Sequence, residues 1–327
     1  MNFKTLIYLL PLSFTFFIQC KKDEVSNGNG NGSNPAINYG KNRFITRIDG
    51  DDREYFVHIP KSYTGKTDVP MVFMLHGTSG DGEEFYNHSG WKEVGESDNI
   101  ITVFPSSWKY CIHTDGETKT TTKWNTPPDA EWTFCAGQSP RNDIKFLNTI
   151  ITEMESRYKI DTRRIYLAGF SNGGQMAAKC SIEMSDKLAA VVQSAGSFYL
   201  DTVYTPKRKL PVLYQVGNED YGPGNTGPAV PMNQFSYLIS TPGLEFKGGK
   251  MYVIANNHIR NFMLNSKYTI SGDTTKASIA TYKPLSASNY EFQYVLIKGL
   301  AHAYPNGDNH PMEAAQVNWA WMKGFAL

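Results

Sequence analysis

A serine between two glycines, at the junction of an apolar run and a helix-like segment, constrains the fold of this chain more than any other feature. Residues 163–180 read RRIYLAGFSNGGQMAAKC, and Ser171 is the central residue of a Gly-x-Ser-x-Gly pattern. The pattern is typical of a sharp strand-to-helix turn, the nucleophile elbow, in which residues without a Cβ flank a strained serine. Because so short a pattern also arises by chance, its surroundings decide. Residues 165–168 predict the strand and residues 175–184 the helix, so the elbow is the expected interpretation.

The N-terminal residues predict export. One basic residue, Lys4, precedes an apolar run at 6–18 that is too short to span a membrane and suits a signal peptide. The run ends in FFIQC, followed by KKDE, which resembles a bacterial lipoprotein signal with cleavage before Cys20 and acylation of its thiol. We therefore expect a lipid anchor at Cys20 in the bacterial outer membrane or at the cell surface. Ordinary secretion, with Cys20 removed, is the alternative.

A polar, glycine-rich stretch separates this N-terminus from the rest of the chain. Residues 26–35, SNGNGNGSNP, cannot bury a core and predict a flexible tether. We therefore expect a signal peptide at 1–19, a lipid-anchored tether at 20–40 and one catalytic domain at 41–327.

Apolar runs that alternate with helix-like stretches predict an α/β sandwich. Continuous apolar runs at 69–77 and 100–106 fit central strands covered on both faces, and the runs AAVVQSAG, LPVLYQVG and EFQYVLIKG follow. RFITRID and EYFVHIP, which alternate apolar and polar residues, predict antiparallel strands that open the sheet. Helices are expected at 83–98, 143–158 and 311–325. This order predicts a sandwich with a mostly parallel central sheet.

Two long segments interrupt the alternation, at residues 107–140 and 221–290. Long excursions in a compact domain are usually functional loops or lids, so we expect both to shape a pocket over the active site. Cys111 and Cys135 bracket one polar segment of the first excursion, and an exported protein is expected to pair them in a disulfide. Cys180 falls in the helix after the elbow, where a small buried thiol is the expected state.

The partners of the serine are sought after it in the chain, at the ends of later strands, in the order acid and then histidine. Asp220 follows the run LPVLYQV, with Glu219 as a neighbouring rival. His302 follows the run EFQYVLIKG at the corresponding strand end. His258 lies in a helix-like stretch and His310 several residues into a polar loop, so His302 is the best-placed base.

The chemistry of ester cleavage needs each of these residue types. The imidazole of His302 takes the proton of the Ser171 hydroxyl, and Asp220 holds that imidazole in the right tautomer. The negative oxygen that develops in the reaction needs two backbone N–H donors. The residue after the nucleophile, Asn172, supplies one, and Thr78 in the segment LHGTSGDG is the candidate for the other. His76 in the same segment is expected to brace the turn and to have no chemical role.

The segments LHGTSGDG, GFSNGGQMA, QVGNEDYG and GLAHAYPNG together resemble the extracellular esterases that include polyhydroxybutyrate depolymerases and feruloyl esterases, carbohydrate esterase family one, within the α/β-hydrolase superfamily. The resemblance covers roughly residues 53–325. It implies Ser171, Asp220 and His302 as the catalytic triad, no cofactor, and cleavage of carboxylic esters on plant polysaccharides or aliphatic polyesters. The acid loop YGPGNTGPAVP and the histidine loop with Ala-Tyr-Pro depart from the usual patterns of the family, and both departures concern the substrate.

Two tryptophans of the first excursion are candidates for contact with the substrate. Trp124 and Trp132 flank the segment NTPPDAE. Each could stack on an aromatic acyl group or a sugar ring, or could instead pack the excursion onto the body of the domain. The sequence leaves both interpretations open.

Composition and motifs argue against two other classes. Lys and Arg number 32 against 31 Asp and Glu, so no field of one sign favours nucleic acid. The chain has no H-E-x-x-H or C-x-x-C pattern, so no metal site is expected.

We predict a serine carboxylesterase that releases feruloyl or acetyl groups from polysaccharide or oligosaccharide. A polyester depolymerase and a non-catalytic, glycan-binding surface lipoprotein are the alternatives.

Overall fold

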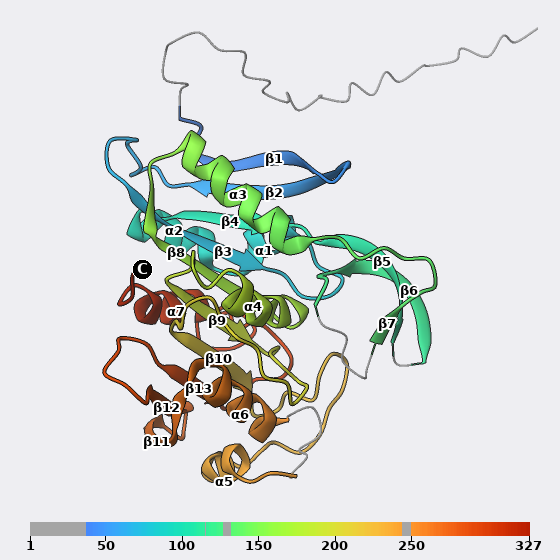
Figure 1. The fold of residues 1–327 in the computed structure, drawn as a ribbon, viewed down its shortest axis with the longest axis vertical. Helices are drawn as coiled ribbons and strands as arrows, with labels where there is room; N and C mark the ends of the chain where they lie inside the picture. Colours follow the sequence, from blue (N-terminus) through green and yellow to red (C-terminus); the bar gives the residue numbers. More distant parts are fainter. Residues whose placement is uncertain (1–36, 115, 127–131, 244–249) are drawn as a thin grey trace, which may run out of the picture. The chain divides into compact units, whose positions relative to one another are not determined.

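The computed structural model describes residues 37–114, 116–126, 132–243 and 250–327 (Figure 1). The predicted signal peptide, Cys20 and most of the predicted tether lie outside the described residues, so the division of the chain at residues 19 and 40 remains a prediction. Within the described residues, no helix combines the length and the apolar character that crossing a membrane requires.

A ten-stranded sheet forms the centre of the described part of the chain, in the order β1-β2-β4-β3-β8-β9-β10-β13-β12-β11. Neighbouring strands from β4 to β13 are parallel, and the strands at both edges are antiparallel. The predicted sandwich with a mostly parallel sheet is confirmed. The strands are β1 (Gly40–Ile48), β2 (Asp51–Ile59), β3 (Val69–Leu75), β4 (Ile101–Pro105), β8 (Ile160–Phe170), β9 (Ala190–Ser194), β10 (Val212–Gly217), β11 (Leu264–Asp273), β12 (Ala277–Pro284) and β13 (Phe292–Ile297).

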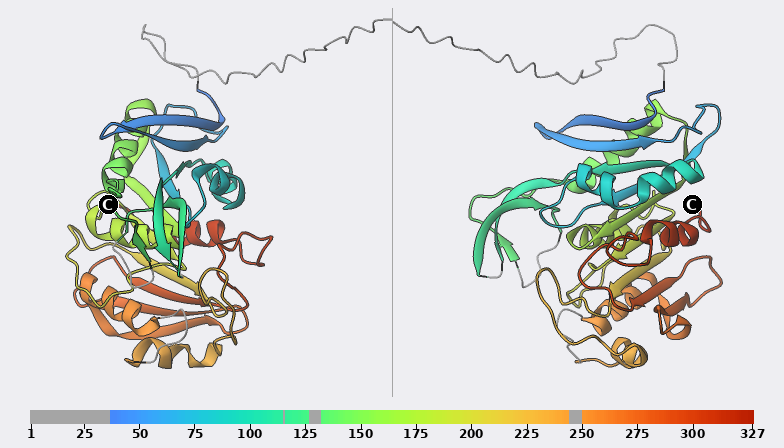
Figure 2. Two further views of the ribbon diagram at one scale, coloured as in Figure 1. Left: turned by 90° about the vertical axis from the view of Figure 1, so that its right-hand side faces the viewer. Right: turned by 180° about the vertical axis from the view of Figure 1, so that it is seen from behind.

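Helices cover both faces of this sheet. Figure 1 shows α3, α4 and α6 in front of the strands, and the reverse view in Figure 2 brings α1, α2 and α7 to the front. The central strands β3, β4 and β9 are buried along their whole length, whereas β1 at the edge alternates between buried and exposed residues. The helices are α1 (Gly82–His88), α2 (Trp91–Asp98), α3 (Asp143–Arg157), α4 (Asn172–Glu183), α5 (Phe235–Ser240), α6 (Met251–Phe262) and α7 (Ala314–Met322), with a 3₁₀ turn at Met232–Gln234.

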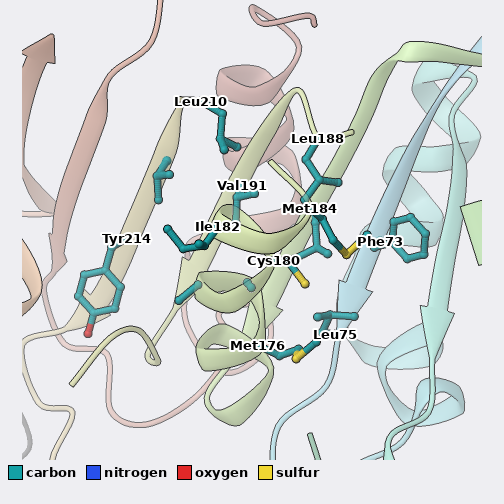
Figure 3. Close-up of a cluster of buried hydrophobic side chains, with 14 of the residues drawn as sticks. Phe73, Leu75, Met176, Cys180, Ile182, Met184, Leu188, Val191, Leu210 and Tyr214 are labelled. Carbon is teal, nitrogen blue, oxygen red and sulfur yellow. The ribbon is translucent and has the colours of Figure 1, made fainter. Parts of the chain in front are cut away.

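The helix α4 packs on the sheet through its apolar side. Figure 3 shows Met176 and Cys180 of α4 on the side of the helix towards Leu75 of β3, in a cluster of buried side chains that also contains Val191 of β9. Cys180 has a free thiol, and burial raises the pKa of that thiol. The prediction of a small buried thiol in this helix is therefore confirmed.

The two excursions have different architectures. The described part of the first forms a separate three-stranded sheet, in the order β6-β5-β7, with β5 (Trp108–Thr114), β6 (Glu117–Lys123) and β7 (Trp132–Phe134), and it projects from the side of the main sheet (Figures 1 and 2). The second carries α5, α6, β11 and β12, and its two strands extend the main sheet beyond β13. The described part of the second excursion is therefore mostly built into the sandwich, and Gly243, Lys250, Tyr252 and Val253 from this excursion line a pocket.

One predicted helix is divided in the structure. Residues 83–98 form α1 and α2, which are separated at Ser89 and Gly90. Gly90 has a φ of 79°, in the left-handed region, and a residue in this conformation cannot continue a right-handed helix. The predicted helix at 143–158 is confirmed as α3, and the helix predicted at 311–325 starts later, at Ala314.

Candidate active site

The elbow has the geometry that the sequence pattern predicts. Strand β8 ends at Phe170, α4 begins at Asn172, and Ser171 between them has a φ of 53° and a ψ of −121°. The flanking glycines are required by close backbone contacts. A Cβ at Gly169 would lie 2.1 Å from the carbonyl oxygen of Gly173, and a Cβ at Gly173 would lie 2.4 Å from that of Leu75. The strain at Ser171 turns its hydroxyl out of the sheet, as the chemistry requires.

The three predicted triad residues form one hydrogen-bonded row. His302 Nε2 lies 2.9 Å from Ser171 Oγ, and His302 Nδ1 lies 2.9 Å from Asp220 Oδ1. An ionised carboxylate only accepts hydrogen bonds, so Nδ1 carries a proton and Nε2 is left to accept the proton of the serine. Asp220 Oδ1 also accepts the N–H of Gly222 at 2.9 Å, and this bond fixes the orientation of the carboxylate.

The topology of the sheet explains how residues so far apart in the sequence meet. Asp220 follows β10 and His302 follows β13, and these two strands are parallel neighbours. Their carboxyl ends therefore lie at the same edge of the sheet, which is also the edge where β8 leads into the elbow. The side chains of Asp220 and His302 are only 6% and 13% exposed, so the carboxylate and the imidazole interact largely shielded from water.

The rival candidates lie elsewhere. Glu219 is exposed beside the acid. His258 is fully buried in α6, where it hydrogen-bonds the carbonyl oxygen of Ile254 and stacks on Phe292 at 4.1 Å between ring centroids. His310 hydrogen-bonds the carbonyl oxygen of Lys298 through Nε2.

The loop after β3 passes directly beside the nucleophile. A Cβ at Gly77 would lie 3.2 Å from the Cβ of Ser171, and Thr78 is the next residue of that loop. On the other side, Asn172 is the first residue of α4, where backbone N–H groups lack acceptors within the helix and the helix dipole favours negative charge. One candidate donor for the developing oxyanion, Asn172, therefore follows Ser171 directly in the sequence, and the loop that carries the other, Thr78, passes beside Ser171 in space.

His76 holds the loop in place, as the sequence predicts. Its ring is fully buried, its Nε2 accepts the N–H of Ser107 at 2.9 Å, and its Nδ1 donates to the carbonyl oxygen of Gly77 at 2.6 Å. Burial lowers the pKa of His76 to about 4, so the imidazole is neutral near pH 7. A neutral ring with both nitrogens engaged braces the turn.

Of the two interpretations that the sequence leaves open for Trp124, the structure supports packing onto the body of the domain and contradicts contact with the substrate. Trp124 is fully buried, and its indole N–H donates to the carbonyl oxygen of His76 at 2.9 Å. A ring enclosed in this way has no face left for an acyl group or a sugar. Trp132 lies in β7, but its side chain is outside the described residues, so its role as a substrate contact remains a prediction.

The predicted disulfide is present. Cys111 of β5 is bonded to Cys135, which follows β7, and the N–H of Cys135 donates to the carbonyl oxygen of Cys111 at 3.1 Å. The disulfide therefore links β5 to the segment that follows β7 within the small sheet.

A pocket of about 280 Å³ is lined by residues that follow β9 and by residues of the second excursion, one of the two segments expected to shape a pocket. The hydroxyl of Tyr199, which lines this pocket, donates to the carbonyl oxygen of Ala195. The carbonyl oxygen of Ser194, the residue before Ala195, accepts the N–H of Ser171 at 2.8 Å. Tyr199 follows an apolar run, so the rule that directed attention to Asp220 and His302 could have found it. The pocket is lined by Tyr199, Leu200, Asp201, Gly243, Lys250, Tyr252 and Val253.

Within the described part of the chain, no group of three or more His, Cys, Asp or Glu side chains is placed to hold a metal ion. The groups that the structure brings together around Ser171 are the hydroxyl, the imidazole, the carboxylate and backbone N–H donors. Such an arrangement is suited to acyl transfer through a covalent intermediate on the serine.

Known proteins with similar sequences are esterases. The chain is 27% identical over 174 residues to a bifunctional acetylxylan esterase/xylanase from Neocallimastix patriciarum, a match that covers 53% of this chain and 22% of that protein. It is 26% identical over 172 residues to feruloyl esterase B from Piromyces equi, covering 51% and 29%. It is 25% identical over 146 residues to poly(3-hydroxyalkanoate) depolymerase C from Paucimonas lemoignei, covering 45% and 32%. The matched segment thus spans less than a third of each of these relatives, and no protein-family model matches the chain.

Solved structures establish the fold. An acetyl xylan esterase from Aspergillus awamori superimposes with a TM-score of 0.53 at 13% identity, covering 86% of this chain and 99% of that one. A poly(3-hydroxybutyrate) depolymerase from Bordetella parapertussis gives a TM-score of 0.53 at 17% identity, covering 89% and 92%. The chain therefore has the α/β-hydrolase fold.

Proposed function

We propose that this chain, a relative of acetylxylan and feruloyl esterases with the α/β-hydrolase fold, is a serine carboxylesterase that removes acyl groups from plant polysaccharide. The observation that carries the proposal is the unbroken row of hydrogen bonds from Ser171 through His302 to Asp220, at 2.9 Å each. A non-catalytic glycan-binding protein would have no need of a strained serine aligned with an imidazole and a carboxylate.

The geometry supports a two-step reaction. Ser171 Oγ attacks the carbonyl carbon of the ester while His302 Nε2 takes its proton, and the backbone N–H groups of Thr78 and Asn172 stabilise the negative oxygen. The imidazolium then protonates the departing alcohol, leaving an acyl group on Ser171. In the second step His302 removes a proton from water, whose oxygen attacks the acyl carbon. The imidazolium returns that proton to Ser171 Oγ as the acid leaves, which restores the starting state. Asp220 stabilises the imidazolium in both steps.

The proposed substrate class rests on the names of the relatives and on the pocket. Two of the relatives are named for acetylxylan and feruloyl esters. Tyr199 and Tyr252, on the wall of the pocket, offer aromatic rings that can stack on a cinnamate or a sugar. A polyester depolymerase is the second candidate, favoured by the relative from Paucimonas lemoignei and by the structure from Bordetella parapertussis.

We place the enzyme at the surface of the cell. The N-terminal sequence supports cleavage before Cys20, acylation of its thiol and a glycine-rich tether to the domain. An anchored enzyme acts on material already held at the cell, which suits the processing of oligosaccharides before uptake. Mass spectrometry of the membrane fraction tests this: the N-terminal peptide should carry lipid at Cys20, and Cys20→Ala should release the protein. A soluble protein without lipid would indicate ordinary secretion.

The activity itself is tested with p-nitrophenyl acetate and butyrate. The unaltered protein should hydrolyse both, and Ser171→Ala should reduce kcat about as much as removal of the whole triad, because the three residues act as a unit. Circular dichroism of the variant checks that it is folded. Activity of Ser171→Ala within tenfold of the unaltered protein would contradict the proposed mechanism, and an inactive unaltered protein would favour the binding role.

The substrate class is tested by direct competition. Methyl ferulate or acetylated xylo-oligosaccharide should be turned over with a higher kcat/KM than short hydroxybutyrate oligomers. Equal or greater efficiency on the hydroxybutyrate oligomers would move the assignment to a polyester depolymerase.

A further inference from the structure

The end of strand β6 lies between the two parts of the site that supply the candidate oxyanion donors. Trp124 contacts both of them. Its indole N–H donates to the carbonyl oxygen of His76 at 2.9 Å, and its main-chain N–H donates to Asn172 Oδ1 at 2.7 Å. We propose that Trp124 is a positioning residue for ester hydrolysis, which holds the Thr78 loop and the start of α4 at the spacing that the oxyanion requires. The proposal rests on the proposed function and adds to it the residue that sets this geometry.

The residues just before Trp124 hold the loop that follows β3. The N–H of Ser79 donates to the carbonyl oxygen of Thr122 at 3.0 Å, and the Thr122 hydroxyl donates to the carbonyl oxygen of Gly80 at 2.6 Å. The hydroxyls of Ser79 and Thr121 share a hydrogen bond of 2.7 Å. Lys123, whose side chain is buried, donates from Nζ to the Thr78 hydroxyl at 3.3 Å. These contacts hold Thr78 and the two residues after it, and the bond from Trp124 to His76 holds the loop before it.

The other side of Trp124 holds the elbow. Asn172 is 3% exposed, and its Oδ1 accepts the main-chain N–H of Trp124. Its Nδ2 donates to Thr126 Oγ1 at 3.2 Å and to Gln175 Oε1 at 3.0 Å. The side chain of Asn172 is therefore occupied with the first excursion and the first turn of α4, which fixes the direction of its backbone N–H.

The residue after Trp124 is anchored to the body of the domain. The N–H of Asn125 donates to Asp143 Oδ2 at 2.7 Å, and Asp143 Oδ1 accepts from Arg53 Nη2 at 2.7 Å. The side chains of Arg53 and Asp143 are 2% and 0% exposed, so this ion pair lies in the interior. The chain at Trp124 is thus held from β2 and α3 as well as from the site, and it can act as a rigid support.

The expected size of the effect follows from the geometry of oxyanion binding. Backbone donors must lie about 2.7–3.1 Å from the developing negative oxygen, and a displacement of about 1 Å can reduce the rate on the order of 100-fold. The ring of Trp124 is enclosed and does not reach the substrate, so its loss should act on the transition state through the loop. Binding of the ground-state ester should change little.

The test compares two Trp→Phe substitutions that each remove an indole N–H bond of 2.9 Å. Trp124→Phe removes the bond to His76, and the control Trp321→Phe removes the bond from α7 to Glu291, far from the site in the fold. With p-nitrophenyl acetate, Trp124→Phe should lower kcat about tenfold while KM stays within twofold, and Trp321→Phe should leave both within twofold. The affinity for phenylboronic acid, which forms a tetrahedral adduct on the serine, should fall by about the same factor as kcat in Trp124→Phe.

The outcomes separate the proposals. If kcat of Trp124→Phe lies within twofold of that of Trp321→Phe, or if kcat falls with unchanged boronate affinity, Trp124 is only a core residue. If Trp124→Phe does not fold, Asn172→Ala, which keeps the backbone N–H and removes the contacts of the side chain, should show the same loss in kcat and in boronate affinity, and their retention would overturn the proposal. An active Ser171→Ala variant would overturn the proposed function itself, whereas an inactive one leaves the role of Trp124 to be decided by its own comparison.

Discussion

The two long excursions from the sheet, residues 107–140 and 221–290, differ in where their hydrogen bonds go. In the described part of the first, β6 and the residues that follow it bond to the loop after β3 and to the elbow. In the second, β12 pairs with β13 from Ala277 to Tyr282, and β11 pairs with β12. The first excursion therefore supports the site, and the second completes the sheet.

The second excursion contacts the candidate triad at its start, where the N–H of Gly222 donates to Asp220 Oδ1. Asp220 precedes it directly, and the turn that follows is closed by paired bonds between Asn218 and Val230. Beyond that turn, Ile254 and Phe262 of α6 are buried in the core on the same face as α4. The comparison shows that the destination of the hydrogen bonds, rather than the length of a loop, distinguishes a functional excursion from a structural one.

The largest expected effect concerns the carboxylate of Asp220, which directly precedes the second excursion. Asp220→Asn should lower kcat on p-nitrophenyl acetate on the order of 10⁴-fold, because the amide favours the wrong tautomer of His302. The neighbouring Glu219→Gln is the matched control and should stay within about threefold, since Glu219 is exposed and does not contact the imidazole. The reverse order of effects would reassign the acid.

Removal of the disulfide tests the claim made for the first excursion, namely that it supports the site as a unit. The bond joins residues 24 positions apart, and its removal in the double variant Cys111→Ser, Cys135→Ser should lower the free energy of unfolding by about 3 kcal/mol through chain entropy. We expect kcat to fall as well, because a looser small sheet holds the loop after β3 less firmly. Thermal unfolding and kinetics of the same samples provide the measurement. Lower stability with unchanged kcat would mean that the first excursion contributes to the stability of the fold and does not support the site.

The sequence predicts the parts of the molecule that depend on local patterns. The central strands and the candidate triad can be predicted because apolar runs mark buried parallel strands, and because active-site residues lie at the carboxyl ends of such strands. The role of Trp124 could not be found in this way. Whether an aromatic ring is enclosed or exposed depends on residues far away in the sequence, here His76 and Asn172.

The differences between the predicted and the observed structure of the second excursion have a similar cause. Strand β11 is exposed along almost its whole length, so its sequence lacks the alternation that identifies a half-buried strand. Its place in the sheet is fixed by pairing with β12, for example between Tyr268 and Tyr282, which the pattern of a single strand does not reveal. The break between α1 and α2 likewise depends on one left-handed glycine, Gly90, within an otherwise helical pattern.

A histidine in the second excursion should contribute to the pH dependence of stability without affecting the chemistry. Burial lowers the pKa of His258 to about 4, below its ordinary value of 6.5. The unfolded chain therefore binds the proton first, so the contribution of His258 is complete above pH 6.5 and is lost as the pH falls towards 4. Between about pH 7.5 and pH 5 the loss should be about 2 kcal/mol.

Substitution of this histidine isolates its contribution. His258→Phe keeps a ring that can stack on Phe292 and removes the titrating group, so its stability should fall less between pH 7.5 and pH 5 than that of the unaltered protein. Urea unfolding at both pH values measures the difference, with the exposed His88→Gln as a control for the loss of one imidazole. Equal losses in His258→Phe and the unaltered protein would show that His258 does not carry the effect.

The smallest expected effects give the sharpest comparison, because they remove one hydroxyl from each excursion. Thr121→Val removes the bond to the hydroxyl of Ser79 at 2.7 Å, and Tyr268→Phe removes the bond to the carbonyl oxygen of Ser236 at 3.1 Å. Each loss should lower the free energy of unfolding by about 1 kcal/mol. Only Thr121→Val should also lower kcat, by roughly threefold with KM unchanged, because its partner lies next to Thr78 whereas the partner of Tyr268 lies at the start of α5. If both variants lose stability and neither loses kcat, or if Tyr268→Phe loses kcat as well, the division between a supporting and a structural excursion is wrong. A loss confined to Thr121→Val would show that contacts one residue away from a donor are enough to set the rate.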